Sequence, residues 1–266
     1  TLREQCLRFA PRFAVMGERG VRNDDATDDD IAAMRRIVAE AAAAGALGLS
    51  TSRTIFHRSI DGTAVPGTYA TEQELTELAM GLADGGGGVF EAITSSSIGA
   101  MQQFGGERFS QEHELHLLNA ISRQAGVNVT FTTAQTRDYP NAWREVLAFA
   151  AEQNATGSRL YPQVASRPIG LLSSLAGYHP YMRRRAYLDL VHLPVSERAA
   201  AMRDPQVRAA ILTGDDVPPA LQGSMENLYL ALQMATPGMY PLDEVVDYEP
   251  TAEHTFAALA AARGTT

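Results

Sequence analysis

The chain has 266 residues, of which 45% are hydrophobic and 20% are charged, and its formal net charge is -9. This length is sufficient for one sizeable core, and the acidic balance excludes the basic footprint of a nucleic-acid-binding protein. Cys6 is the single cysteine, the first ten residues lack the apolar segment of a signal peptide, and no apolar run could span a bilayer, so a soluble cytoplasmic protein with no membrane partner is expected.

Short apolar runs alternate with helix-period segments over the first two thirds of the chain. Helix-capping residues followed by one-sided apolar spacing predict helices that begin near Thr27, Thr71, Ser110 and Asp138. Because single helices separate the apolar runs, the sequence predicts adjacent parallel strands built from βα units. The runs that fit buried strands are residues 13–17, 46–51, 88–93, 127–133 and 159–164.

This order of elements predicts the α/β class, as a partial (β/α)8 TIM-type barrel of about five strands with a mostly helical C-terminal region. An open doubly wound sheet is the alternative. Residues 1–170 would form the partial barrel. Residues 171–266 would belong to the same domain as a helical insertion before the next strand or as a small lid. An incomplete barrel leaves open strand edges and an exposed inner face, so self-association is expected.

Polar residues follow several of the predicted strands, and in a barrel the functional groups lie at the carboxyl ends of the strands. Residues 52–62 are the densest such segment. Arginine can hold a carboxylate by two parallel hydrogen bonds, and histidine can donate, accept or ligate. The alternative interpretation is a solvated loop whose charges pair with one another. The predicted substrate-binding residues are Arg53, His57, Arg58, Gln163 and Arg167.

A metal-ligand set is not apparent in the sequence. A zinc site needs three or more ligands that converge on one point, and no His-x-His motif occurs. His113 and His116 are one turn apart on a helix expected outside the barrel, so we expect them to be exposed rather than ligands. Glu91 is the only charged residue within a predicted strand. It could act as a base or ligand, or it could form an internal ion pair with an arginine; Arg53 could pair with it or with Glu18.

The second predicted strand and its loop carry a recognisable pattern. Residues 45–54 read Gly-Ala-Leu-Gly-Leu-Ser-Thr-Ser-Arg-Thr, and His57-Arg58, Asp61-Gly62 and Val65-Pro66-Gly67-Thr68 follow. This pattern resembles the D-aminoacylase (N-acyl-D-amino-acid deacylase) family of the amidohydrolase superfamily. Stretches at residues 15–20, 143–147, 162–170 and 247–250 support the resemblance, which therefore extends along nearly the whole chain.

The resemblance implies a TIM-barrel hydrolase in which zinc activates a water molecule. That water attacks the amide of an N-acyl-amino acid or a similar small acylated compound, and a carboxylate moves the proton. The family's His-x-His motif, its metal-binding cysteine and its catalytic aspartate belong to segments that do not occur in this sequence. We therefore expect an internal piece of a longer enzyme that is inactive by itself.

Two further family histidines would fall on the third and fourth predicted strands. Ile93 stands at the first position, and Thr133 or Ala134 at the second, while Gln135 replaces a family lysine. The sequence therefore gives no metal ligand and no catalytic residue. The alternative function is a non-catalytic or truncated barrel-derived protein with a binding or assembly role.

Overall fold

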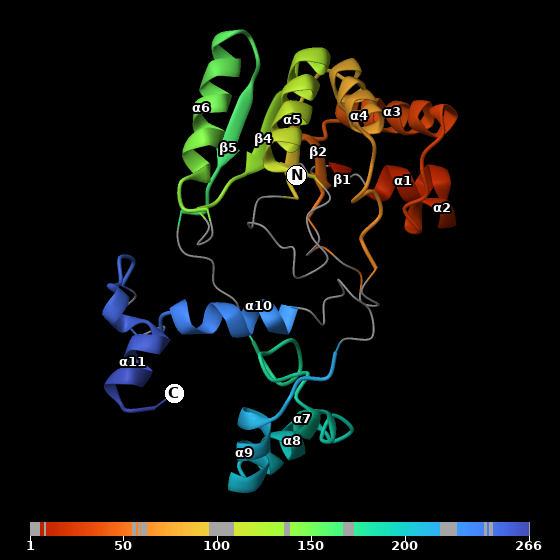
Figure 1. The fold of residues 1–266 in the computed structure, drawn as a ribbon. Coiled ribbons are helices and arrows are strands. Elements are labelled where there is room, and N and C mark those ends of the chain that lie inside the picture. Colours follow the sequence, from red (N-terminus) through yellow and green to blue (C-terminus); the bar gives the residue numbers. More distant parts are fainter. Residues whose placement is uncertain are drawn as a thin grey trace. The chain divides into compact units, whose positions relative to one another are not determined.

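The computed structural model describes residues 6–7, 9–54, 57, 59, 63–95, 109–135, 139–166, 173–218, 228–241, 244 and 247–265. The chain divides into two compact units, Thr1–Val164 and Ala165–Thr266 (Figure 1). The first unit ends directly after the last strand, six residues before the boundary predicted at residue 170.

One parallel sheet organises the first unit. Its strands run in the spatial order β1-β2-β3-β4-β5, which is also their order in the chain. A doubly wound sheet reverses its strand order at a switch point, and these five strands show no reversal. The fold is therefore α/β, with the sequential strand order of a barrel segment. The strands are β1 (Cys6–Leu7), β2 (Gly48–Ser52), β3 (Val89–Ile93), β4 (Asn128–Thr132) and β5 (Leu160–Gln163).

Helices connect the strands and pack against one another in sequence (Figure 1). Right-handed crossovers between neighbouring parallel strands keep the helices on one face of a sheet. Alternate strand residues, including Leu49, Phe90 and Phe131, are buried in the same core as Met34 and Ile121 from the helices. The helical layer consists of α3 (Asp28–Ala43), α4 (Glu72–Asp84), α5 (Gln111–Ala125) and α6 (Ala142–Ala155).

Three of the four predicted helix starts are formed by side-chain caps, whereas α6 follows Asn141, which makes no side-chain cap, and Asp138 lies outside the described residues. Thr27 and Asp30 make a reciprocal capping box at the start of α3, with N–H to oxygen distances of 3.0 and 3.2 Å. The hydrogen bonds from Arg19 and from the Thr27 backbone lower the pKa of Asp30 to about 2. The hydroxyls of Thr71 and Ser110 accept from the first turns of α4 and α5. These local signals were therefore sufficient to place the starts of α3, α4 and α5.

The strand predicted at residues 13–17 is wrong. That segment belongs to the helix α1 (Phe9–Met16), and the first strand is the two-residue β1 instead. Arg12 and Met16 lie one helical turn apart and are both buried, whereas Phe13 is 56% exposed, so the burial follows a helical rather than an alternating period. Arg12 forms a buried ion pair with Glu74 of α4, which fixes α1 against the helical layer.

Because residues 13–17 were predicted as a strand, the two charged residues that follow were expected at the carboxyl end of that strand. Glu18 and Arg19 lie in the short helix α2 (Glu18–Val21), and the Arg19 guanidinium donates to both carboxylate oxygens of Asp30 at 2.8 and 2.9 Å. Neither residue is at the carboxyl edge of the sheet. They hold the segment before α3 and are not part of the candidate site.

The second unit is helical over its described residues, with one isolated antiparallel bridge between Arg184 and Asp216. Few of its apolar side chains are buried. None of the helices described in the chain is long and apolar enough to cross a membrane. The helices are α7 (Arg185–Leu188), α8 (Val195–Ala201), α9 (Pro205–Thr213), α10 (Leu228–Ala235) and α11 (Phe256–Ala262), with 3-10 turns η3 (Thr236–Gly238) and η4 (Ala252–His254).

Candidate functional site

The strand residues that point away from the helices form a polar face, here called the inner face. Ser50 of β2 pairs in register with Glu91 of β3, and Thr130 of β4 pairs with Tyr161 of β5. Tyr161 is 52% exposed although it lies within a strand, which shows that this face is open in the first unit. At the carboxyl edge, one row further, the inner face carries Ser52, Ile93, Thr132 and Gln163.

The loop after β2 folds back over this edge. The backbone N–H of His57 donates to the carbonyl oxygen of Thr54 at 3.4 Å, and that of Val65 donates to the carbonyl oxygen of His57 at 3.3 Å. Ser59 and Thr63 close the loop through their backbones and hydroxyls. Asp61 and Gly62, where a turn was expected, lie outside the described residues. The described part of the loop is therefore held by its own hydrogen bonds.

His57 makes a close side-chain contact at this edge. Its Nδ1 lies 2.7 Å from the hydroxyl oxygen of Ser52, the last residue of β2. Partial burial lowers the pKa of the imidazole below its usual value, which favours a neutral ring at pH 7. Part of the His57 side chain remains open to solvent. The sequence placed His57 on the rim, but it gave no signal for this pairing.

Arg53 is turned into the protein rather than toward the open inner face. It is 3% exposed, and its Nε donates to the two carboxylate oxygens of Glu114 at 2.8 and 3.0 Å. Another nitrogen donates to the carbonyl oxygen of Ala70, and the guanidinium lies 4.3 Å from the ring centre of Phe109. The expected pairing with Glu18 or Glu91 is wrong. The structure instead favours a structural role for Arg53 at the rim of the sheet, where it pairs with Glu114 of α5.

Two of the remaining predicted site residues lie on the inner face. Gln163 is exposed at the end of β5, on the inner face. Glu91 lies in the middle of that face and is half-buried, and within the described part of the chain it has no ion-pair partner. Arg58 and Arg167 lie outside the described residues. Among the predicted substrate-binding residues, His57 and Gln163 are thus the ones that the structure places on the carboxyl edge.

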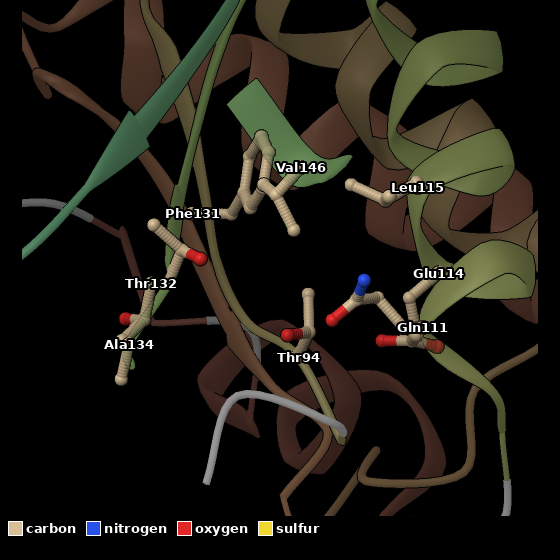
Figure 2. A pocket seen from close by; sticks show the side chains of 9 residues that line it. Thr94, Gln111, Glu114, Leu115, Phe131, Thr132, Ala134 and Val146 are labelled. Carbon is tan, nitrogen blue, oxygen red and sulfur yellow. The ribbon is translucent and has the colours of Figure 1, made fainter. Parts of the chain in front are cut away.

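A small hollow of about 310 Å³, which includes space open to solvent, lies between the sheet and the helices at the same end of β3 and β4. Figure 2 shows that polar and apolar side chains both line it, with Gln111, Glu114 and Leu115 of α5 facing Phe131 and Thr132 of β4. The Glu114 carboxylate is neutralised by Arg53 and also accepts from the Ser95 backbone at 3.4 Å. No sequence motif pointed to this hollow, because its lining comes from four separate segments.

No zinc site is formed by the described residues. Nowhere among them do three or more histidine, cysteine, aspartate or glutamate side chains gather as a metal site would require. His113 and His116 lie on α5, in the helical layer, as predicted. His116 is exposed, and His113 is half-buried at 3.5 Å from Glu72. The zinc expected from the family resemblance therefore does not fit the part of this chain that the structure describes.

Neither a protein-family model nor a curated protein sequence matches the chain. Among solved structures, a D-aminoacylase mutant in complex with copper chloride is similar over 60% of this chain, at 22% identity and a TM-score of 0.44. An N-acyl-D-glutamate deacylase from Bordetella bronchiseptica, complexed with zinc and a phosphonate inhibitor, is similar over 59%, at 20% identity and a TM-score of 0.44. The chain spans 29% of the length of each. These are proteins of the family that the sequence motifs resemble.

Proposed function

We propose that this chain is part of an amidohydrolase that cleaves the amide bond of an N-acyl-amino acid or a similar small acylated compound. The observation that carries the proposal is the position of the recognised motif. Its residues form β2 and the loop that follows, so that Ser52 and His57 lie at the carboxyl edge of a sequentially ordered parallel sheet. That edge is where barrel enzymes bind their substrates.

The side chains at the edge are suited to binding a small polar substrate. Gln163 can both donate to and accept from an amide group, and the exposed hydroxyl of Thr132 lies beside it in the register. When Nδ1 of a neutral His57 accepts the Ser52 hydroxyl, Nε2 carries the ring proton and is a further donor. Arg58 and Arg167, which lie outside the described residues, are assigned to the substrate carboxylate on chemical grounds alone.

Water activation at neutral pH requires a metal or a strong base. The described residues offer no zinc-ligand set, so this chain is assigned substrate binding and orientation rather than metal ligation. Arg53 is assigned to the rim, because its guanidinium is occupied by Glu114 and Ala70. In this proposal the ligands and the group that moves the proton come from other residues of the complete enzyme.

The test compares this chain with the product of its complete coding sequence. Release of free amino acid from N-acetyl-D- and N-acetyl-L-amino acids is measured with added zinc and with a chelator. We expect zinc-dependent hydrolysis by the complete product and none by this chain alone. A complete product that hydrolyses no N-acyl-amino acid would overturn the proposal and favour a binding or assembly role. Zinc-dependent turnover by the chain alone would overturn the assignment of the metal ligands to other residues of the complete enzyme.

One substitution tests the substrate-binding assignment within an active complete protein. Gln163→Ala removes a hydrogen-bonding group at the edge, and we expect KM to rise by about tenfold, the loss of roughly one good hydrogen bond. Tyr161→Phe is the matched control, because it changes a side chain on the same strand and face but one row further from the edge. Equal kinetics for both variants and the unchanged protein would remove Gln163 from the site.

A further inference from the structure

Ser52 and His57 form a pair that binding of an N-acyl substrate does not require. The Ser52 hydroxyl oxygen and His57 Nδ1 are 2.7 Å apart, within the distance that joins a serine nucleophile to its base. Ser52 ends β2 on the inner face, and its side chain is only half-buried. A reagent that approaches this edge from solvent can therefore reach the hydroxyl.

The surrounding loop holds the imidazole over the end of the strand. Backbone hydrogen bonds on both sides of His57, with Thr54 and Val65, fix the position of its main chain. Partial desolvation lowers the pKa of the ring below its usual value, which favours the neutral form at pH 7. A neutral ring with its proton on Nε2 leaves Nδ1 free to accept the Ser52 hydroxyl proton. In that tautomer the Ser52 hydroxyl donates to Nδ1, which is the direction of proton transfer that a general base requires.

We propose that Ser52 is a nucleophile with His57 as its base, and that the pair reacts with activated esters and with fluorophosphonates without a metal. With an ester, His57 Nδ1 takes the Ser52 proton as the hydroxyl oxygen forms a bond to the carbonyl carbon. The bond to the leaving oxygen then breaks, and the imidazolium returns the proton to that oxygen. Water hydrolyses the acyl-serine by the same route, which restores both side chains. This activity is separate from the proposed amide hydrolysis.

The pair lacks the third member of a catalytic triad. Within the described residues no carboxylate lies at ion-pairing distance from His57. A base that is not oriented by such a group is less effective, because the imidazolium that forms is not stabilised. The reaction is therefore confined to substrates with good leaving groups, and unactivated amides are not cleaved by this route.

The experiment uses an alkyl fluorophosphonate, which leaves a stable product. The Ser52 oxygen bonds to phosphorus, fluoride departs, and the hydroxyl proton passes through His57 to solvent. The protein is treated with a chelator present and digested with trypsin, which releases residues 37–53 as one peptide. Fragmentation of that peptide distinguishes Ser50 from Ser52. We expect one adduct per chain, on Ser52.

Three variants distinguish reaction at the Ser52–His57 pair from general reactivity of surface hydroxyls. Ser52→Ala should abolish the adduct, and His57→Gln should slow its formation by about a hundredfold, the lower end of the contribution of a general base. Ser50→Ala is the matched control and should label at the unchanged rate, because Ser50 lies on the same strand and face and no histidine bond to it is seen among the described residues. Far-ultraviolet circular dichroism establishes that each variant is folded.

Several outcomes would overturn the proposal. An adduct on Ser50, on a tyrosine or on His57 itself would show that Ser52 is not the nucleophile, and so would equal labelling of Ser52→Ala and the unchanged protein. An unlabelled chain would also reject it, even if a variant fails to fold, because the unchanged protein is mapped directly. None of these results bears on zinc-dependent amide hydrolysis, which is measured with a different substrate and with added zinc.

Discussion

The two units of the chain differ in what holds them together. In the first, one connected apolar core extends from Met16 to Leu160 and includes the helix-facing side of every strand from β2 to β5. In the second, the buried apolar side chains of the described residues are Tyr187, Ile211, Tyr229 and Leu232. Burial of apolar area is the main favourable term in folding, so the first unit should carry most of the stability.

Polar contacts take a larger part in the second unit. Arg198 donates to the carbonyl oxygens of Leu175, Val191 and Leu193 and to the hydroxyl of Tyr187. One arginine thus joins α7, α8 and the segment before them. The second unit thus depends on a few directional contacts, whereas the first depends on a distributed core.

The largest effect is expected in the core of the first unit. Phe90 on β3 is fully buried, and Phe90→Ala should lower the free energy of unfolding by about 3–5 kcal/mol, through lost burial and the cavity that remains. Urea unfolding measures this change. Tyr161→Ala is the control, an aromatic residue on the open face of β5, and should cost less than about 1 kcal/mol. Similar losses for both variants would mean that the inner face is also part of a packed core.

The next effect concerns the buried ion pair of Arg53 and Glu114, whose side chains are each 2% exposed. Glu114→Leu leaves the guanidinium buried without its partner and should cost about 3 kcal/mol. The double variant Arg53→Met, Glu114→Leu removes both charges and should be more stable than either single variant. Urea unfolding of the three proteins gives the coupling between the two sites. Strictly additive losses would show that the two charges do not act as a pair.

This ion pair could not be predicted from the sequence pattern. The loop after β2 was located from its length and composition, but Arg53 and Glu114 are 61 residues apart, and no periodicity connects them. The same holds for Arg12 and Glu74. Local signals such as the Thr27 cap depend on neighbouring residues and were read correctly. Pairings across the helical layer depend on the packing of whole elements, which the pattern of one segment does not contain.

The first strand was misplaced for a different reason. A four-residue apolar run fits a buried strand and one turn of a buried helix equally well. The run at residues 13–16 was therefore ambiguous by itself, and only the burial of Arg12 beside Met16 decides for the helix. The true first strand, β1, has two residues and leaves almost no pattern. β3 and β4 are rich in β-branched and aromatic residues, whereas β2 and β5 are poorer in them and were predicted as short runs between helical segments.

A smaller and more local effect is expected from Arg198→Met in the second unit. This variant keeps much of the apolar stem but removes four hydrogen bonds, and should destabilise α7 and its surroundings by about 2 kcal/mol, the range for hydrogen bonds of a charged group. Amide hydrogen exchange should become faster in residues 185–188 and remain unchanged in β3. Arg203→Met, an exposed arginine on the same unit, is the control. Equal amide protection of residues 185–188 in both variants would show that the hydrogen bonds of Arg198 do not stabilise α7.

The smallest effect is a pH dependence of the second unit that originates in His179. This side chain is buried against the ring of Tyr187, and its Nδ1 accepts from the Tyr181 backbone. Burial chiefly, and the positive charge of Arg198 in addition, lower the pKa of the imidazole below its usual value of about 6.5. The folded unit therefore holds the ring neutral, while the unfolded chain takes up a proton as the pH falls below that value.

Because the unfolded state binds more protons, this contribution to stability is present above about pH 6.5 and is lost as the pH falls further, by at most about 1.4 kcal/mol per pH unit. Hydrogen exchange in residues 185–188, followed from pH 7.5 to 5 and corrected for the intrinsic rate, should show this loss. His179→Gln should flatten it, whereas His57→Gln in the first unit should leave it unchanged. The His57 control is needed because burial also lowers the pKa of that ring, and a measurement on the whole chain would combine the two. If the loss of stability at low pH persists in His179→Gln, another group titrates, and protonation of His179 does not affect the stability of the second unit.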